Sequence, residues 1–546
     1  MADEQENPQS ADARLKTVTT AVAKPKTGTE LLDEIISKGN MVRGDLTLPE
    51  NAQLKTKSTE MITEFGTQIK ANAAFKTAAT TGDLMDAIED RIAGIDADIS
   101  VQLNAIMHSP EFQALEASWR GLNYLVMKAE TGDDLKLRLL NATKRELQKD
   151  IEKATEFDQS TLFKKIYEEE YGTFGGFPYS CLVGDYYFDS GPQDLGLLQG
   201  LAGVAAAAHA PFLTAAAPAL FNWSDFGEMN NRRDLAKGFS ATDLAPWNTF
   251  RESEDSRYVA MVVPKVLLRL PYDPVNKPVE EFGFNEFRIR YQEGTDGKPT
   301  GKDGKPLSKG EPKIFKEDVD SKNSSKYLWG NGAYALAERI TDAFSHYHWC
   351  AAIRGVEGGG KVEGLPFHTF KTDDGDVALK CPTEISITDR REKELNDLGF
   401  ISLCHCKGQN YAAFFGGQTT NKPIKYITDA ATANARLSSS LPYILAASRF
   451  AHYLKVIMRD KIGSFMTRQN VSNYLNQWIS QYVLLDDDAP QAVKARFPLR
   501  EARVDVIDQP GKPGCYNAVV FLKPHFQLDE LTVSIRLVAE LPASAK

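Results

Sequence analysis

The glycine-rich stretch at 355–361 is the part of the sequence whose residue types and spacing come closest to a known chemical site. It fits the G-x-x-x-x-G-K portion of a phosphate-binding loop, in which backbone N–H groups and the lysine hold phosphate oxygens. Val362 stands where Ser or Thr would bind magnesium, and 334–354 has a helical pattern where a strand should precede the loop. We therefore expect a glycine turn here. A nucleotide-binding enzyme that uses this loop remains the alternative from a different functional class.

Two short runs of histidine and cysteine are candidate metal ligands: His346, His348 and Cys350, and Cys404, His405 and Cys406. A structural zinc site usually draws on two short ligand pairs separated along the chain, and neither run provides them. On a helix, His346 and His348 would point about 200° apart and could not share one ion. Cys404 and Cys406 would lie on one face of a strand, where small core residues are the more ordinary interpretation. We expect no metal site.

Three aspartates, Asp185, Asp189 and Asp194, lie on and just after an expected strand, where catalytic carboxylates are often found. The sequence offers no identifiable acid or base partner for them, so turn and capping roles are favoured. Motifs of the G-x-S-x-G, H-E-x-x-H and G-x-G-x-x-G types do not occur. We expect no catalytic residue, no cofactor and no enzymatic activity.

Composition indicates an ordinary globular protein. The 546 residues include 64 Lys and Arg and 74 Asp and Glu, which gives a formal net charge of −10. This balance argues against a nucleic-acid partner, because neutralising phosphates requires a clustered basic surplus. Six cysteines are too few for a disulfide framework and favour a reducing compartment. Residues 1–10 lack the apolar core of a secretory signal, and prolines interrupt the apolar stretch 195–220, so membrane insertion is not expected.

The elements that position these residues predict a mixed α/β fold in which helices cover sheets. Strands are expected at 180–188 and 258–270, with a closely packed helix at 194–209 between them. After residue 490 the residue pattern is typical of β-strands. The segments 502–508 and 515–522 flank a Gly/Pro turn and are expected to form a hairpin.

An apolar pattern with helical spacing begins near Asp83, and Pro110 starts a second helix. We expect Phe112, Leu115 and Trp119, with Leu122, to carry the apolar side of that helix in a small helical module. The expected domains are listed in chain order: a flexible arm with a short amphipathic helix (1–57), a helical domain (58–155), an α/β domain with a disordered insertion at 293–325 (156–381), and a C-terminal α/β domain with a terminal hairpin and strand (382–546).

Several long segments resemble one family, the large subunit of the type VI secretion contractile sheath, which is related to phage tail sheaths. The segments include FQALEASWRGL (112–122), YGTFGGFPY (171–179), VPKVLLRLPY (263–272), the glycine loop through Leu365 and Pro366, PHFQL (524–528) and SIRLVAELP (534–542). The resemblance extends over nearly the whole chain. It explains the apparent phosphate motif as a turn of the family. The main alternative within the same structural class is a sheath protein of a phage-like or extracellular contractile particle.

What the resemblance implies is a structural protein in a bacterial assembly. Family members pair with a small sheath subunit, and the heterodimers polymerise around an inner tube of hexamers. Contraction of the sheath drives the inner tube into a target cell, and an AAA+ ATPase then disassembles the contracted sheath. The implied location is the bacterial cytoplasm, in an assembly docked to a membrane-anchored baseplate.

Two segments are candidate partner-binding sites. Leu31, Leu32, Ile35 and Ile36 form one apolar face of a short helix near the N-terminus. This helix resembles the element that the disassembly ATPase recognises, and an apolar helix face suits docking into a groove.

Near the C-terminus, Val533, Ile535 and Leu537 alternate with polar residues, as in a half-buried strand. In the family, terminal strands from neighbouring subunits join a C-terminal sheet. We therefore expect these three residues to belong to a sheet shared between subunits. An ordinary sheet within one chain is the alternative.

Overall fold

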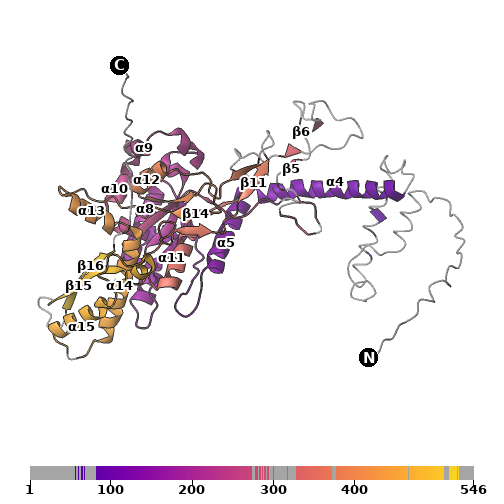
Figure 1. Cartoon of the computed structure of the whole chain (residues 1–546). Coiled ribbons are helices and arrows are strands. Elements are labelled where there is room, and N and C mark those ends of the chain that lie inside the picture. The colour runs from indigo at the N-terminus through magenta and orange to yellow at the C-terminus, as the bar shows by residue number, and fades with distance from the viewer. Residues whose placement is uncertain are drawn as a thin grey trace, which may run out of the picture. The chain divides into compact units, whose positions relative to one another are not determined.

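A computed structural model of the chain describes residues 81–272, 327–371, 377–464, 466–508, 516–525 and 527, together with short pieces and single positions at 56–67 and 277–317. The chain divides into two compact units, 1–106 with 272–318, and 107–271 with 319–546. The first unit contains most of helix α4 (Thr81–Met107), whose Asp96 carboxylate accepts a hydrogen bond from Gly283 N at 3.1 Å. Most of the described residues belong to the second unit (Figure 1).

The helices of the second unit are α5 (Pro110–Lys128), α6 (Lys144–Lys153), α7 (Thr161–Phe163), α8 (Pro192–Ala208), α9 (Leu235–Phe239), α10 (Ala245–Glu252), α11 (Ala333–Tyr347), α12 (Asp389–Asp397), α13 (Asp429–Ser438), α14 (Leu441–Asp460), α15 (Arg468–Ser480) and α16 (Gln491–Arg496). Its strands are β1 (Leu182–Phe188), β2 (Phe212–Ala216), β3 (Val259–Val263), β4 (Val266–Leu267), β9 (Trp329–Gly330), β10 (Lys361–Glu363), β11 (His368–Lys371), β12 (Val377–Lys380), β13 (Phe400–His405), β14 (Tyr411–Phe414), β15 (Leu499–Asp508) and β16 (Tyr516–Pro524). Short strands of the first unit are β5 (Arg288–Ile289), β6 (Gln292–Glu293), β7 (Pro299–Thr300) and β8 (Lys316–Glu317).

A six-stranded sheet forms the centre of the second unit, in the order β1-β2-β3-β13-β14-β10. The first four strands in this order are parallel, and β14 and β10 continue the sheet in antiparallel fashion. Parallel neighbours need crossover connections, and α8 supplies the one between β1 and β2. The expected mixed α/β fold with helix-covered sheets is confirmed.

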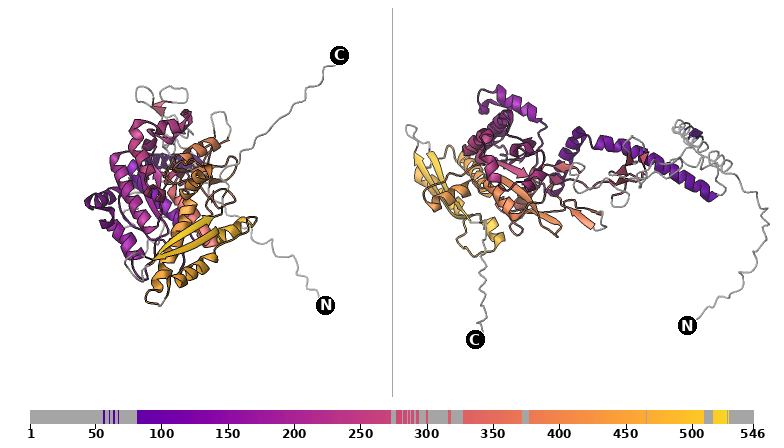
Figure 2. Two further views of the ribbon diagram at one scale, coloured as in Figure 1. Left: turned by 90° about the vertical axis from the view of Figure 1, so that its left-hand side faces the viewer. Right: turned by 90° about the horizontal axis from the view of Figure 1, so that it is seen from above.

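Both faces of the central sheet are buried, and β3 shows this most clearly. Val259, Met261 and Val263 belong to the core that contains α8 and α10. Ala260 and Val262 belong to the core that contains α11. A strand covered on both faces needs an unbroken apolar run, which is the pattern that predicted it. Figures 1 and 2 show the helices around this sheet.

Helix α5 uses a different face from the one its apolar pattern suggested. Gly121 lies against the Tyr334 ring of α11, and Leu125 is buried in the same core. Phe112, Leu115 and Trp119 are exposed, Trp119 to 62%. α5 therefore packs on α11 and β9, and these large apolar side chains remain exposed in the described structure.

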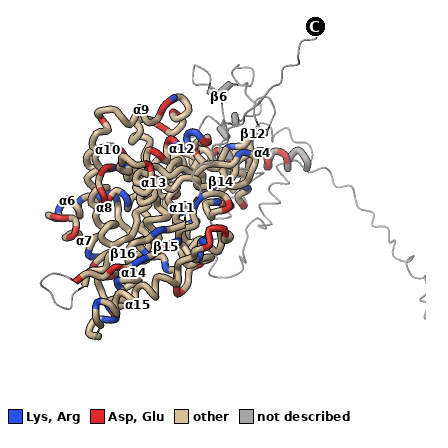
Figure 3. Tube along the Cα trace, turned by 60° about the vertical axis from the view of Figure 1, so that its left-hand side comes forward, with Lys and Arg blue, Asp and Glu red and all other residues tan. Residues whose placement is uncertain are grey.

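Other expectations concern residues outside the described part. The helix around Leu31 to Ile36, the strand at 531–537 and most of the insertion at 293–325 lie there. The division of the chain at 57, 155 and 381 stays a prediction. Among the described helices, none is long and apolar enough to span a bilayer. Along the chain trace in Figure 3, the positions of Lys and Arg are interspersed with those of Asp and Glu.

Candidate functional site

The C-terminal hairpin is a partly exposed piece of regular β structure in the described second unit. β15 and β16 pair antiparallel from Leu499 opposite Pro524 to Asp508 opposite Tyr516, with an irregularity next to Leu499. The hairpin predicted at 502–508 and 515–522 is confirmed. It forms a sheet of its own, separate from the central sheet (Figure 2).

One face of the hairpin packs on helices α14 and α15 through residues that alternate along both strands. Val504 is fully buried and Leu499 nearly so, and Val520 and Leu522 pack against the same core. Trp349 lies at the centre of this core. Its ring stacks on Phe450 with a centroid distance of 4.3 Å, so the hairpin has a rigid aromatic support.

The opposite face of the hairpin is mixed, and nothing in the described chain covers it. Charged and polar side chains share it with three apolar ones: Glu501, Arg503, Asp505, Asn517 and Lys523. Ile507, Val519 and Phe521 are each about half exposed there. They alternate with charged neighbours, and Phe521 lies opposite Arg503 in the register. A two-stranded sheet is marginal by itself, and a further layer or strand over these exposed apolar side chains would stabilise it.

The two outer edges of the hairpin differ. On β15, the Val504 N–H donates to Asn476 Oδ1 at 2.9 Å, and Asn476 Nδ2 donates to Val504 O at 2.7 Å. Leu499 is also occupied, because its N–H bonds to Tyr482 O and its carbonyl accepts from Leu484 N. The middle and the start of this edge are therefore closed by groups of the same chain.

The outer edge of β16 is open among the described residues. Because Val504 directs its backbone groups away from β16, its register partner Val520 directs its own groups away from β15. The two-residue repeat extends this orientation to Ala518 and Leu522, and no backbone partner is found for the outward groups in the part of the chain that the structure describes. An edge of this kind can accept a strand from another polypeptide.

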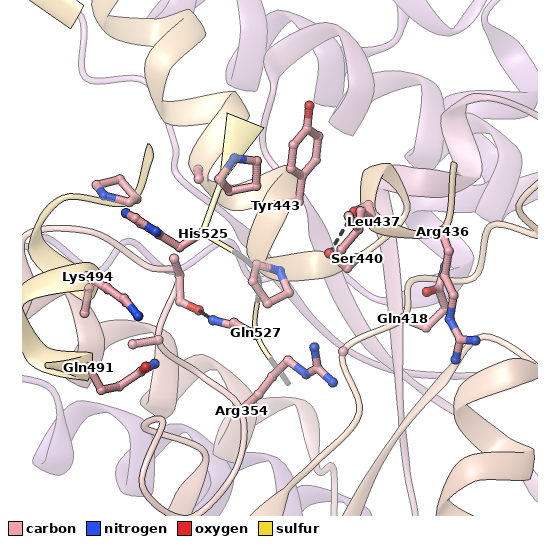
Figure 4. Close-up of a pocket in the computed structure, with 18 of the residues that line it drawn as sticks. Arg354, Gln418, Arg436, Leu437, Ser440, Tyr443, Gln491, Lys494, His525 and Gln527 are labelled. Carbon is pink, nitrogen blue, oxygen red and sulfur yellow. Dashed lines mark hydrogen bonds between the residues drawn. The ribbon is translucent and has the colours of Figure 1, made fainter. Parts of the chain in front are cut away.

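A cavity of about 70 Å³ lies at the base of the hairpin. Side chains from α13, α14, α16 and the segment after β16 surround it, among them Arg436, Tyr443, Lys494 and His525 (Figure 4). Arg436 pairs with the Asp397 carboxylate at 3.0 Å, and Lys494 donates to a backbone carbonyl. The cavity is several times smaller than a typical ligand site of about 300 Å³ or more, and its cations already have partners.

The glycine stretch is a compact turn whose amides bond within the chain. Gly355 N donates to Phe414 O at 2.7 Å, and Gly360 N donates to Gly355 O at 2.8 Å. Gly355 and Gly359 have positive φ values of 72° and 92°, which only glycine adopts readily. The loop leads into strand β10 rather than a helix, so its geometry does not form a phosphate cradle.

The histidine and cysteine runs do not converge, and no cluster of potential metal ligands occurs among the described residues. His346 lies in the last turn of α11, and its Nδ1 is 2.9 Å from Asp342 O. Burial raises the pKa of the Cys350 thiol to about 12. Desolvation does the same for Cys404, which is buried in strand β13. Neutral, buried thiols of this kind behave as core residues.

Two of the three aspartates occupy the turn roles expected for them. The Asp189 carboxylate accepts from Gly191 N at 2.7 Å, and the Asp194 carboxylate accepts from Asp189 N at 2.8 Å. Asp194 also pairs with Lys144 at 2.5 Å, which ties the start of α6 to the start of α8. These contacts satisfy the carboxylates structurally.

Sequence patterns did not reveal two side chains that shape this region. Asn476, which closes the edge of β15, lies on a helix whose spacing gives no sign of that contact. His452 on α14 is 2% exposed, and its Nε2–H donates to Ala208 O at 2.9 Å. A histidine within an apolar helical stretch could have been noticed as a buried polar group, but its partner lies far away in the sequence.

The predicted partner-binding residues lie outside the described part of the chain. This applies to Leu31, Leu32, Ile35 and Ile36 and to Val533, Ile535 and Leu537. The described hairpin ends at Pro524, and the second group follows it in the sequence.

Comparison with known proteins identifies the family. Residues 89–297 and 298–421 match the family described as EvpB/VC_A0108, tail sheath N-terminal domain, and residues 430–541 match EvpB/VC_A0108, tail sheath gpW/gp25-like domain. The type VI secretion system sheath protein TssC1 of Pseudomonas aeruginosa is 45% identical over 531 residues, which are 96% of this chain and 98% of that protein.

Two solved structures show a weak overall likeness. A chain of the anti-feeding prophage baseplate covers 63% of this chain and 66% of its own length, with a TM-score of 0.32 and 10% identity. A chain of the contracted anti-feeding prophage sheath covers 62% and 66%, with a TM-score of 0.31 and 11% identity. These scores are too low to support a conclusion, so the assignment depends on the sequence matches. The chain belongs to the EvpB/VC_A0108 tail sheath family of type VI secretion sheath proteins.

Proposed function

We propose that this chain is a structural subunit of the contractile sheath of a bacterial type VI secretion system. In this proposal it pairs with a small sheath subunit, polymerises around an inner tube of hexamers and contracts to propel that tube. The assembly lies in the bacterial cytoplasm and docks to a membrane-anchored baseplate. The relationship to a secretion-system sheath protein over 96% of the chain supports this function over that of an extracellular contractile particle.

The observation that carries the proposal is the asymmetric hairpin. Asn476 closes the middle of the β15 edge, while the β16 edge at Ala518 and Leu522 remains open. A strand from a neighbouring subunit can add to β16, and its side chains would meet the exposed Val519 and Phe521. Such links tolerate the rotation of rigid bodies during contraction, because the tethering segments absorb the motion.

A proline at the open edge tests this assembly step. The Ala518 N–H points away from β15, so Ala518→Pro removes a donor that the hairpin itself does not use. Co-expression with the small sheath subunit and electron microscopy should show tubes for the natural chain and none for Ala518→Pro. The control Ala518→Thr keeps the N–H and should form tubes. Tubes of normal length with the proline variant would contradict strand addition at β16.

The C-terminal strand is the occupant that we propose for this shared sheet. Val533, Ile535 and Leu537 would place their apolar side chains on one face of a strand in a neighbouring sheet. A chain that ends before Leu531 should remain folded and lose tube formation. Full-length tubes from this truncated chain with the small subunit would refute the assignment and leave these residues to a sheet within the chain.

The N-terminal helix is proposed as the contact for the AAA+ disassembly ATPase. Replacing Leu32 and Ile35 together with Asp would destroy the apolar face that such a groove requires. We expect sheaths to assemble normally from this variant, and we expect ATPase binding to contracted sheaths to be lost in a pull-down. The matched control Asp33→Asn should bind. Unchanged ATPase binding by the double variant would overturn the assignment.

A further inference from the structure

A buried cluster of aromatic and basic side chains joins segments that are far apart in the sequence. It lies where the end of α8, the π-helical segment η3 (Lys164–Tyr171) and the middle of α14 meet. The His452 ring of α14 lies 5.2 Å from the Tyr171 ring of η3 and 6.2 Å from the His209 ring at the end of α8, measured between ring centres. π-Helical turns are rare and occur frequently at functional sites, which singles out this junction.

Both histidines have restricted hydrogen bonding. His452 Nε2–H donates to Ala208 O, the last carbonyl of α8, at 2.9 Å, and its Nδ1 has no hydrogen-bond partner among the described atoms. His209 ends α8 with a φ of 51°, and its Nδ1 is 3.2 Å from Tyr258 Oη at the end of η7 (Asp255–Tyr258). A charged His452 ring would carry a second N–H without an acceptor in this buried site, which is unfavourable.

The surroundings of His452 are positively charged. Lys455 Nζ lies 3.4 Å from the centre of the Tyr171 ring, so a cation already occupies the face of this ring. The titratable and charged groups of the cluster are listed by element: Arg449, Lys455 and Arg459 of α14, His209 at the end of α8, Tyr171 of η3 and Tyr258 of η7. None of the groups that shift the pKa of His452 in the described chain is a carboxylate. No anion there would offset the charge of an imidazolium.

Burial and these charges keep both rings neutral near pH 7. Desolvation lowers the pKa of His452 to about 4; the Ala208 carbonyl acts in the opposite direction, and the neighbouring positive groups lower the pKa further. Desolvation and the charge of Lys455 lower the pKa of His209 as well. Histidine in water titrates near pH 6.5. Acid therefore favours any opening that brings these rings into contact with water.

The end of η3 is held by fewer contacts than the two long helices. α8 contributes several leucines to the main core, and α14 contributes Phe450 and Leu454 to the core beneath the hairpin. In the loop after η3, by contrast, Phe174 and Phe177 are more than half exposed. Arg459 of α14 holds the start of this loop through two backbone carbonyls. We expect an opening of the cluster to begin at this loop.

We propose that His452 and His209 form a pH-sensitive latch, which holds the end of η3 and the loop 172–177 against α14 while both rings are neutral and releases them in acid. Release moves the Tyr171 ring away from His452 and lets water reach the imidazole. The surface around Phe174 and Phe177 then differs between neutral and acidic conditions. This device belongs to the chain itself and does not depend on the proposed sheath function.

Hydrogen exchange of the full chain at pH 7.5 and pH 5.0, corrected for the pH dependence of exchange in unstructured peptides, tests the latch. His452 alone should raise the opening equilibrium about 30-fold at pH 5.0, because the opened ring binds a proton that the closed ring does not. The Gly172 N–H, which donates to Tyr167 O at 2.6 Å at the end of η3, should lose protection by this factor. Protection that does not change with pH would overturn the latch.

Low concentrations of urea separate a local opening from global unfolding. A local opening exposes little surface, so exchange at Gly172 should hardly respond to urea, whereas exchange of the β3 amides should accelerate steeply. If Gly172 and β3 showed equal protection and equal urea dependence, the cluster would open only when the whole unit unfolds. That result would contradict the latch.

Three substitutions assign the pH response to these side chains. His452→Gln keeps a donor for Ala208 O and should reduce the response at least tenfold, while His346→Gln, at an exposed position of α11, should retain it in full. Lys455→Gln removes a cation that lowers the pKa of both rings, so its response should be smaller than that of the natural chain. This variant decides the question if His452→Gln does not fold. The full response in His452→Gln or in Lys455→Gln would refute the proposal.

Discussion

Protonation of His452 should destabilise the packing of α14 against α8. Its Nε2–H donates to Ala208 O, and its Nδ1 has no hydrogen-bond partner among the described atoms. Desolvation lowers the pKa of His452 from 6.5 to about 4, and the positive charges of Arg449 and Lys455 and the neighbouring His209 act in the same direction. The folded chain therefore holds this imidazole in its neutral form.

The sign and the size of the pH effect follow from this difference. Between pH 6.5 and about 4 the unfolded chain binds a proton at His452 that the folded chain does not. The free energy of unfolding therefore decreases as the pH is lowered through that window. The loss from this one residue is about 2 kcal/mol at pH 5 and about 3 kcal/mol at pH 4. Above pH 6.5 His452 is neutral in both the folded and the unfolded chain, so its contribution to the free energy of unfolding no longer changes with pH.

Urea unfolding at pH 7.5 and pH 5.0 measures this loss. His452→Gln keeps an N–H donor but has no titrating group. Between pH 7.5 and pH 5.0 this variant should therefore lose about 2 kcal/mol less free energy of unfolding than the natural chain. His346→Gln makes the same substitution at an exposed position of α11 and controls for the general effect of replacing a histidine by glutamine. If the natural chain and His452→Gln lost the same stability between the two pH values, the reasoning about burial would be refuted.

Three further substitutions test the packing of the second unit. Glu116→Ala removes the carboxylate that accepts from Arg269 Nε at 2.7 Å, in a pair where the Arg269 side chain is 3% exposed, and should cost about 1.5–3 kcal/mol in urea unfolding. Gly121→Val would place a methyl-bearing carbon 2.5 Å from the Tyr334 ring, so a loss of about 1–3 kcal/mol is expected in the same assay, and no loss would contradict the close packing. Trp349→Ala removes the centre of the aromatic core beneath the hairpin and should cost about 3–5 kcal/mol, with faster hydrogen exchange in β15 as its local signature.

Local patterns in the sequence were sufficient to predict several elements. The hairpin was predictable because the alternation of 502–508 and 515–522 and the intervening turn involve residues close together in the chain. The fully apolar run in β3 identified a strand buried on both faces for the same reason. The failure of the glycine stretch as a phosphate site was visible from Val362 and from the elements around it.

What the sequence determined by itself was the type of these elements, the family and the absence of a recognisable catalytic motif. Which helix face is buried depends on packing in three dimensions: Gly121 and Leu125 of α5 contact the core, while Trp119 stays exposed. The tertiary structure also decided that Asn476 closes one hairpin edge and leaves the other open. The spacing of apolar residues depends on near neighbours in the sequence, and it indicates only that one face of a helix or strand is apolar. The partner of that face depends on residues far away in the chain, whose positions are settled only when the whole core packs.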